Sequence, residues 1–177
     1  ARPIQTRPMK SVRPDPLLLW PAYTLFPLAG LSILVFGASA GGDAAMSAIG
    51  IALLALNAVF VVNQLYATSV GVDRDELVYR TWFGLVEARV PVGSVQRVDA
   101  KRYAGGHGGW SAPHFVARGR EEVVRVNTKA YRLADFVPLL ALIRSANPRG
   151  ELDDFWTRVA RGEDVSKEVT LTPKGRF

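Results

Sequence analysis

The sequence predicts an α+β membrane protein: an N-terminal hairpin of two transmembrane helices, then a small antiparallel β-barrel or curled sheet that a C-terminal helix caps. Three observations lead to this prediction. Two long segments near the N-terminus contain no Asp, Glu, Lys or Arg. Several short runs rich in β-forming residues follow them, and an amphipathic segment comes after those runs. The chain has 177 residues, enough for one water-soluble domain beside such an anchor.

The two apolar segments are long enough to cross a bilayer. The first extends over residues 17–38 and the second over residues 45–66. A helix of roughly 20 apolar residues crosses about 30 Å of hydrocarbon. The link between them, residues 39–43, is short and turn-forming, so the two helices should lie side by side and antiparallel. We therefore assign residues 16–67 to a two-helix transmembrane hairpin.

A cleavable signal peptide is the alternative for the first segment. A basic flank precedes it, and Ala38-Ser39-Ala40 is of the type that is cleaved. The apolar region of a signal peptide covers about 7–15 residues, however, and this segment is longer. We therefore expect an anchor that the chain retains.

The distribution of Lys and Arg predicts the orientation of the hairpin. The basic, Pro-rich tail of residues 1–15 carries four such residues, the link carries none, and the region after the second helix carries several. Basic residues stay on the cytoplasmic side. Both termini and the domain are therefore expected in the cytoplasm, at a bacterial inner membrane. The basic candidates for contact with lipid or protein are Arg2, Arg7, Lys10, Arg13, Arg97, Lys101 and Arg102.

The second helix contains small and polar residues that suit helix contacts. Ala48 and Ala52 are four residues apart, which places them on one face, and small residues let helices approach closely in lipid. Asn57 needs a polar partner inside the membrane. Packing within the hairpin and contact with helices of another protein both explain these residues, and the sequence leaves both open.

Residues 68–162 have the pattern of a small α+β domain, and residues 163–177 form a polar tail. Strands are predicted at residues 77–82, 85–90, 92–98, 115–118 and 122–126, with Phe83-Gly84 as a tight turn. A Gly-rich loop covers residues 103–113. Asp135 is expected to cap a helix that has Pro138 in its first turn and ends at Asn147-Pro148. A second short amphipathic segment follows at residues 152–159.

The order of these segments resembles the bacterial pleckstrin-homology-like (PH-like) membrane proteins. The matching residues are Ser69-Val70-Gly71-Val72-Asp73, Glu76-Leu77-Val78-Tyr79-Arg80, Gly84 and Val90-Pro91-Val92-Gly93-Ser94-Val95-Gln96-Arg97-Val98. In that family a similar run of turn, strand, glycine, strand and proline follows two helices. The resemblance covers about residues 16–146 and implies a PH-like barrel on the cytoplasmic face. It does not imply phosphoinositide binding, and the Gly-rich loop at 104–112 departs from it.

The sequence offers no catalytic or metal-binding pattern. It has no cysteine, and its two histidines, His107 and His114, lie in or beside the Gly-rich loop. That loop lacks the Lys-Ser/Thr of a phosphate-binding P-loop. Trp110 at its end is a candidate interface anchor. We expect no enzymatic activity, no cofactor and no metal, and the absence of an aromatic-plus-basic repeat argues against nucleic acid as a partner.

Two functions remain possible from the sequence. The first is a non-catalytic accessory or scaffolding subunit that binds other integral membrane subunits of a larger complex, with respiratory or photosynthetic assemblies as the expected setting. The second is a free-standing, membrane-anchored PH-like adaptor that binds anionic lipid or peptide. The net charge of +6 suits anionic lipid in both cases.

Overall fold

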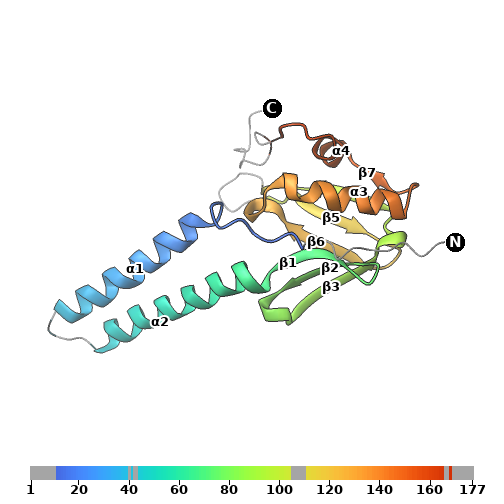
Figure 1. Cartoon of the computed structure of the whole chain (residues 1–177). Helices are drawn as coiled ribbons and strands as arrows, with labels where there is room; N and C mark the ends of the chain where they lie inside the picture. Colours follow the sequence, from blue (N-terminus) through green and yellow to red (C-terminus); the bar gives the residue numbers. More distant parts are fainter. Residues whose placement is uncertain (1–10, 40, 42–43, 105–110, 166–167, 169–177) are drawn as a thin grey trace.

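The structure is a computed structural model, and it describes residues 11–39, 41, 44–104, 111–165 and 168. A pair of helices projects from one side of an α+β domain that contains two β-sheets (Figure 1). The predicted order of helices, then strands, then a C-terminal helix is confirmed. Within the described part of the chain, neither sheet closes into a barrel.

The helix pair consists of α1 (Trp20–Ser39) and α2 (Ala44–Val62), and a π-helical turn (Asn63–Ala67) continues α2. The two helices lie side by side and antiparallel (Figure 1). Of the helices in the described residues, Ala44–Ala67 alone is long and apolar enough to cross a membrane, and the apolar helix Tyr23–Ser39 is shorter. The structure thus contains one candidate membrane span, and the two-span hairpin stays a prediction.

Glycines allow the backbones of α1 and α2 to approach closely. A Cβ atom added at Gly50 would lie 2.9 Å from the backbone nitrogen of Leu34 and 3.0 Å from the carbonyl oxygen of Gly30. No larger side chain fits there unless the helices move apart. Such contacts between small residues are typical of helices that pack in lipid.

The first sheet is an antiparallel meander with the strand order β1-β2-β3, and the second has the order β6-β5-β4-β7. In the second sheet β4, β5 and β6 are antiparallel, whereas the short β7 runs parallel to β4. The strands are β1 (Ser69–Asp73), β2 (Glu76–Thr81), β3 (Val86–Pro91), β4 (Arg97–Lys101), β5 (His114–Arg118), β6 (Val123–Asn127) and β7 (Glu151–Leu152).

The hydrophobic core receives residues from both sheets and from the helices α3 (Val137–Ala146) and α4 (Asp154–Ala160). Aromatic rings occupy its centre: Trp156 packs 5.2 Å from Phe115 and 5.4 Å from Phe136, measured between ring centroids. All three side chains are fully buried. Other fully buried members are Val70, Leu77, Val90, Val98, Val124, Val126, Leu139 and Leu140.

Two local predictions about the domain are wrong. The expected strand at residues 92–98 is a 3-10 turn, Val92–Ser94, followed by β4 from Arg97. Val92 and Val95 are both buried and three residues apart, which suits a helical turn better than a strand. Asp135 does not cap α3, because it lies inside the 3-10 turn Leu133–Phe136 that leads directly into the helix.

Other local predictions are confirmed. Pro138 lies in the first turn of α3, and Asn147 ends that helix. The second amphipathic segment is α4, where the side chain of Asp153 caps the helix by accepting a hydrogen bond from the Trp156 amide at 2.9 Å.

We predict that Gly50→Leu separates the helix pair, whereas Ala52→Leu, at an exposed position of the same helix, does not. Overpacking of a tight contact costs about 2 kcal/mol, which corresponds to a melting temperature lower by about 4–8 °C for a protein of this size. Thermal unfolding of the detergent-solubilised protein measures both variants. Equal melting temperatures for the two would contradict a close contact at Gly50.

Candidate functional site

The candidate site is the junction where both ends of the helix pair meet the domain. On the N-terminal side, Val12 pairs with Val70 of β1: the Val12 amide donates to the Val70 carbonyl at 2.7 Å, and the Val70 amide donates back at 2.9 Å. Val12 is 6% exposed and belongs to the core. Residues 11–15, which the sequence assigned to a separate tail, thus cover the free edge of β1 and satisfy its backbone groups.

Asp15 fixes the start of the first helix. Its backbone amide donates to the Ala130 carbonyl at 2.6 Å. Its carboxylate accepts a hydrogen bond from the Leu17 amide at 2.8 Å and another from the Arg132 guanidinium. The Arg132 bond, followed by the Leu17 bond, lowers the pKa of Asp15 below its ordinary value. Asp15 is therefore a buried anion that ties the chain entering α1 to the segment after β6.

Asn63 fixes the end of the second helix. It is fully buried in the π-helical turn, and its side-chain oxygen accepts a hydrogen bond from the Phe83 amide at 3.1 Å. Nearby, the hydroxyls of Thr68 and Thr81 form a buried hydrogen bond of 3.0 Å. π-Helical turns within α-helices are frequent at functional sites. The turn between β2 and β3 is thereby held against the end of α2.

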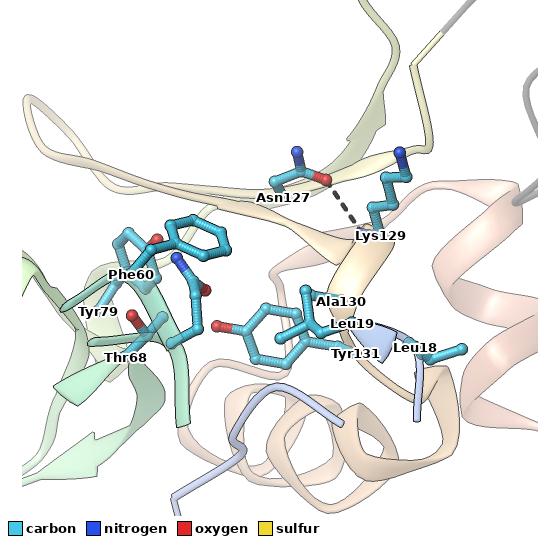
Figure 2. A pocket seen from close by; sticks show the side chains of 10 residues that line it. Leu18, Leu19, Phe60, Thr68, Tyr79, Asn127, Lys129, Ala130 and Tyr131 are labelled. Atoms are coloured by element: carbon cyan, nitrogen blue, oxygen red, sulfur yellow. Dashed lines mark hydrogen bonds between the residues drawn. The ribbon is translucent and has the colours of Figure 1, made fainter. Parts of the chain in front are cut away.

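A cavity of about 320 Å³ lies between these contacts, and we call it the junction cavity (Figure 2). Its walls come from the start of α1, the end of α2, the first sheet and the segment after β6. They combine apolar and polar side chains: Leu18, Leu19, Phe60, Gln64, Thr68, Tyr79, Asn127, Lys129, Ala130 and Tyr131. A mixed lining of this kind is typical of sites for small amphiphilic molecules.

Tyr131 supplies the least satisfied polar group of the junction cavity. The residue is 4% exposed, and its hydroxyl has no hydrogen-bond partner among the described residues. Figure 2 shows the ring pointing into the cavity, toward the wall that contains Thr68 and Tyr79. Burial raises the pKa of Tyr131 well above its ordinary value, so the group remains a neutral donor. A bound polar group would relieve the cost of this buried hydroxyl.

Two lysines, Lys101 and Lys129, lie near the junction cavity at one end of the second sheet. Register places Lys101, His114 and Asn127 side by side on β4, β5 and β6, and Asn127 accepts from the Lys129 amide at 3.0 Å (Figure 2). Lys101 and Lys129 are exposed and belong to none of the ion pairs found in the described part of the chain, and the Lys101 ammonium lies 5.5 Å from the centroid of the Tyr103 ring. Lys129, which lines the cavity, therefore gives it one cationic group, with Lys101 farther along the same end of the sheet.

The basic residues predicted from the sequence do not act as one group. Arg97 lies at the opposite end of β4 from Lys101 and forms a 2.5 Å ion pair with Asp99. Arg102 donates to the backbone carbonyl of Glu168. Arg13 is exposed on the segment that covers β1. Arg2, Arg7, Lys10 and Trp110 lie outside the described residues.

The predicted helix residues have different surroundings. Ala48 and Ala52 are exposed on α2, so the contact inside the pair uses glycines instead. Asn57 is 9% exposed and lines an apolar cavity beside the helices. Its low exposure favours packing within the helix pair, one of the two explanations that the sequence left open.

The described residues contain no group of three or more His, Asp or Glu side chains that could hold a metal ion. The ring of His114 contacts Tyr103 edge to face at 4.8 Å between centroids, and its Nδ1 lies 3.1 Å from the Ala112 carbonyl. Burial lowers the pKa of His114, which favours its neutral form near neutral pH. What the site offers is hydrogen bonds and charge for binding.

Sequence reasoning missed Asp15 and Tyr131 as junction residues. A signal existed for Asp15, because an Asp that precedes Pro16 and an apolar helix is a common helix start. The contacts of Tyr131 depend on tertiary structure and have no local signal.

Comparisons with protein-family models, with curated proteins and with solved structures found no match to this chain.

We predict that Asp15→Asn lowers the free energy of unfolding by about 1 kcal/mol at neutral pH, because it removes a charged hydrogen bond to a partly exposed guanidinium. Since the folded-state pKa of Asp15 is lowered, its stabilisation is present above its ordinary value of 3.8 and is lost as pH falls through the folded-state pKa. The gap in melting temperature between wild type and variant should stay constant at about pH 5–7 and shrink below about pH 4. A gap that widens on acidification would contradict this role.

Proposed function

We propose that this chain is a non-catalytic accessory subunit of a larger membrane complex, which it stabilises through its helix pair and a domain held in a fixed orientation at the cytoplasmic surface. The observation that carries the proposal is the junction. Three contacts, from Val12, Asp15 and Asn63, bind both ends of the helix pair to the domain. A domain attached in this way cannot rotate freely about a linker, which is the property that a scaffold requires.

The exposed surface of the helices supports a location in the bilayer. Leu25, Phe26 and Leu56 are each more than 60% exposed, and similar apolar residues continue along both helices. So large an apolar surface is unfavourable in water and marks a membrane or protein contact. α1 contains 20 residues, which at 1.5 Å per residue gives about 30 Å. The proposal therefore takes α1, whose apolar part Tyr23–Ser39 is shorter, as the second span beside Ala44–Ala67.

Charge supports the cytoplasmic orientation. Lys101 and Lys129 lie at the end of the domain that adjoins the helices, and Arg13 precedes α1. Residues 39–43, at the far end of the pair, contain no Lys or Arg. Both observations agree with the positive-inside rule for a two-pass protein in a bacterial inner membrane.

The PH-like assignment of the domain is part of this proposal. Two consecutive antiparallel meanders and a following amphipathic helix, α3, have the order that the resemblance implies. β6 contacts both β2 and β3, so the two sheets meet at that side and enclose one core.

Purification from the native membrane in mild detergent, with an affinity tag on the chain, tests the proposed function. We expect the protein to elute in size-exclusion chromatography with other integral membrane subunits in fixed stoichiometry. Identification of those subunits tests whether the complex is respiratory or photosynthetic. Elution of the chain alone, in detergents that preserve other complexes of the same membrane, would contradict the proposal.

Binding of anionic lipid is the second candidate function, and the junction cavity favours it. The cavity offers an apolar wall for an acyl chain, the unpartnered hydroxyl of Tyr131 and the cationic side chain of Lys129. Each basic residue near an anionic membrane surface contributes about 1 kcal/mol. A free-standing adaptor would use this cavity alone, whereas a subunit could use it to hold a lipid within the complex.

We predict that dispersed phosphatidylglycerol raises the melting temperature of the purified protein more than phosphatidylcholine does, because a ligand of the folded state stabilises it by mass action. Lys129→Glu should weaken the apparent affinity at least about five-fold, the factor that corresponds to 1 kcal/mol. Arg120→Glu, the same charge change at an exposed loop remote from the cavity, is the matched control. Equal responses to the two lipids would exclude a charge-selective lipid site.

A further inference from the structure

The turn between β2 and β3 presents a continuous group of exposed apolar side chains. Residues 82–86, which we call the apolar turn, connect the two strands through a 3-10 turn, Trp82–Gly84. The exposed fractions are 48% for Trp82, 54% for Phe83, 88% for Leu85 and 49% for Val86. Turns that face water normally carry Gly, Pro, Asn, Asp or Ser, so the composition of this turn does not suit an aqueous environment.

The backbone of the apolar turn supports the same conclusion. Trp82 and Phe83 have φ angles of 51° and 56°, and Gly84 has a φ of 83°. Left-handed φ angles are uncommon for bulky side chains, and hairpin turns that need them use Asn, Asp or Gly. The chain therefore places two aromatic residues where small polar ones would be less strained. Strain of this kind is typical of functional sites.

The apolar turn is attached to the end of α2. The Phe83 amide donates to the side-chain oxygen of Asn63 at 3.1 Å. Trp82 also lines an apolar cavity of about 460 Å³ together with residues of both helices: Phe26, Leu53, Leu56, Asn57, Val59 and Phe60. Figure 1 shows this end of the β2–β3 hairpin beside the base of α2. The turn is thus a lateral extension of the apolar surface of the helix pair.

The length of α2 gives the depth of the turn. At 1.5 Å per residue, about 20 residues cross the hydrocarbon layer. Counted from Ala44, where α2 begins, a span of that length ends at Asn63. Asn63 is the residue that binds the Phe83 amide. The apolar turn is therefore at the boundary between hydrocarbon and head groups, the depth at which Trp and other aromatic residues are enriched.

We propose that the apolar turn is immersed in the bilayer beside the end of α2, as a third membrane contact of this chain. The inference rests on the proposed location of the helix pair in a membrane. The partner that fits this surface is lipid, at the boundary between acyl chains and head groups. The exposed surface of the turn is apolar and is continuous with the apolar surface of the helices. Immersion of the turn would add a contact between the domain itself and the bilayer, beside those of the two helices.

Site-directed spin labelling tests the immersion, since the chain has no native cysteine. Three single-cysteine variants are labelled with a nitroxide: Leu85→Cys, Ile51→Cys and Asp75→Cys. Each full-length variant is then reconstituted separately into phosphatidylcholine nanodiscs. Collision with oxygen, which concentrates in lipid, is compared with collision with a water-soluble nickel chelate. Ile51 is an exposed residue within α2, and Asp75 is in the turn at the opposite end of β2.

We expect a several-fold higher ratio of oxygen to nickel accessibility at residue 85 than at residue 75, with a ratio at residue 51 that is higher still. A water-like ratio at residue 85 with a lipid-like ratio at residue 51 would overturn the inference and leave the membrane anchor intact. A water-like ratio at residue 51 would instead contradict the proposed location of the helices. An immobilised label at residue 85 that neither reagent reaches would indicate a protein contact and would also overturn the inference.

Asn63→Ala provides an independent test of how the turn is held. Removal of the acceptor of the Phe83 amide should increase the mobility of the label at residue 85 and leave the label at residue 75 unchanged. Unchanged mobility at both positions would contradict the positioning role of Asn63.

Discussion

The pairing of Val12 with Val70 is the constraint on which the arrangement of the molecule depends. Val12 precedes α1 and Val70 follows α2, so these two backbone hydrogen bonds join segments that the whole helix pair separates. β1 is an edge strand, and its free N–H and C=O groups require partners. The segment before α1 supplies them. Both ends of the helix pair therefore meet the domain at one sheet edge.

This constraint concentrates the polar contacts at the boundary between the apolar helices and the domain. Asp15, Asn63 and the pair Thr68–Thr81 all lie there and are buried. Hydrogen bonds in such surroundings are strong, and unpaired groups are correspondingly costly. The unpartnered Tyr131 hydroxyl and the Asn63 amide nitrogen are in the same region of the described chain. Of these two groups, the Tyr131 hydroxyl belongs to the lining of the junction cavity, which is why we place binding there.

The elements that the sequence predicts well are those with a strong local pattern. Charge-free runs identify the helices, and runs of β-forming residues identify β2, β3, β5 and β6 within one or two residues. The pattern fails at Val92–Ser94, where inward residues three apart form a turn, and at β7, which has two residues and exists only through its pairing with β4. The junction could not be predicted from the sequence for a different reason. Val12, Asn63 and Tyr131 belong to segments far apart in the sequence that come to the junction only in the folded chain, so no local stretch of sequence contains the site.

The net charge of +6 does not show which basic residues are available for membrane contact, because the fold pairs some of them with acidic residues. On the first sheet, Arg80 bonds to Asp73 and Glu87, and Arg89 bonds to Glu76, so neighbouring strands neutralise these cations. Lys101 and Lys129, at the end of the domain next to the helices, form no such pair in the described residues. At physiological salt, exposed charges are largely screened beyond about 8 Å. The position of two unpaired lysines therefore matters more for membrane contact than the total charge, and a count of basic residues in the sequence cannot make that distinction.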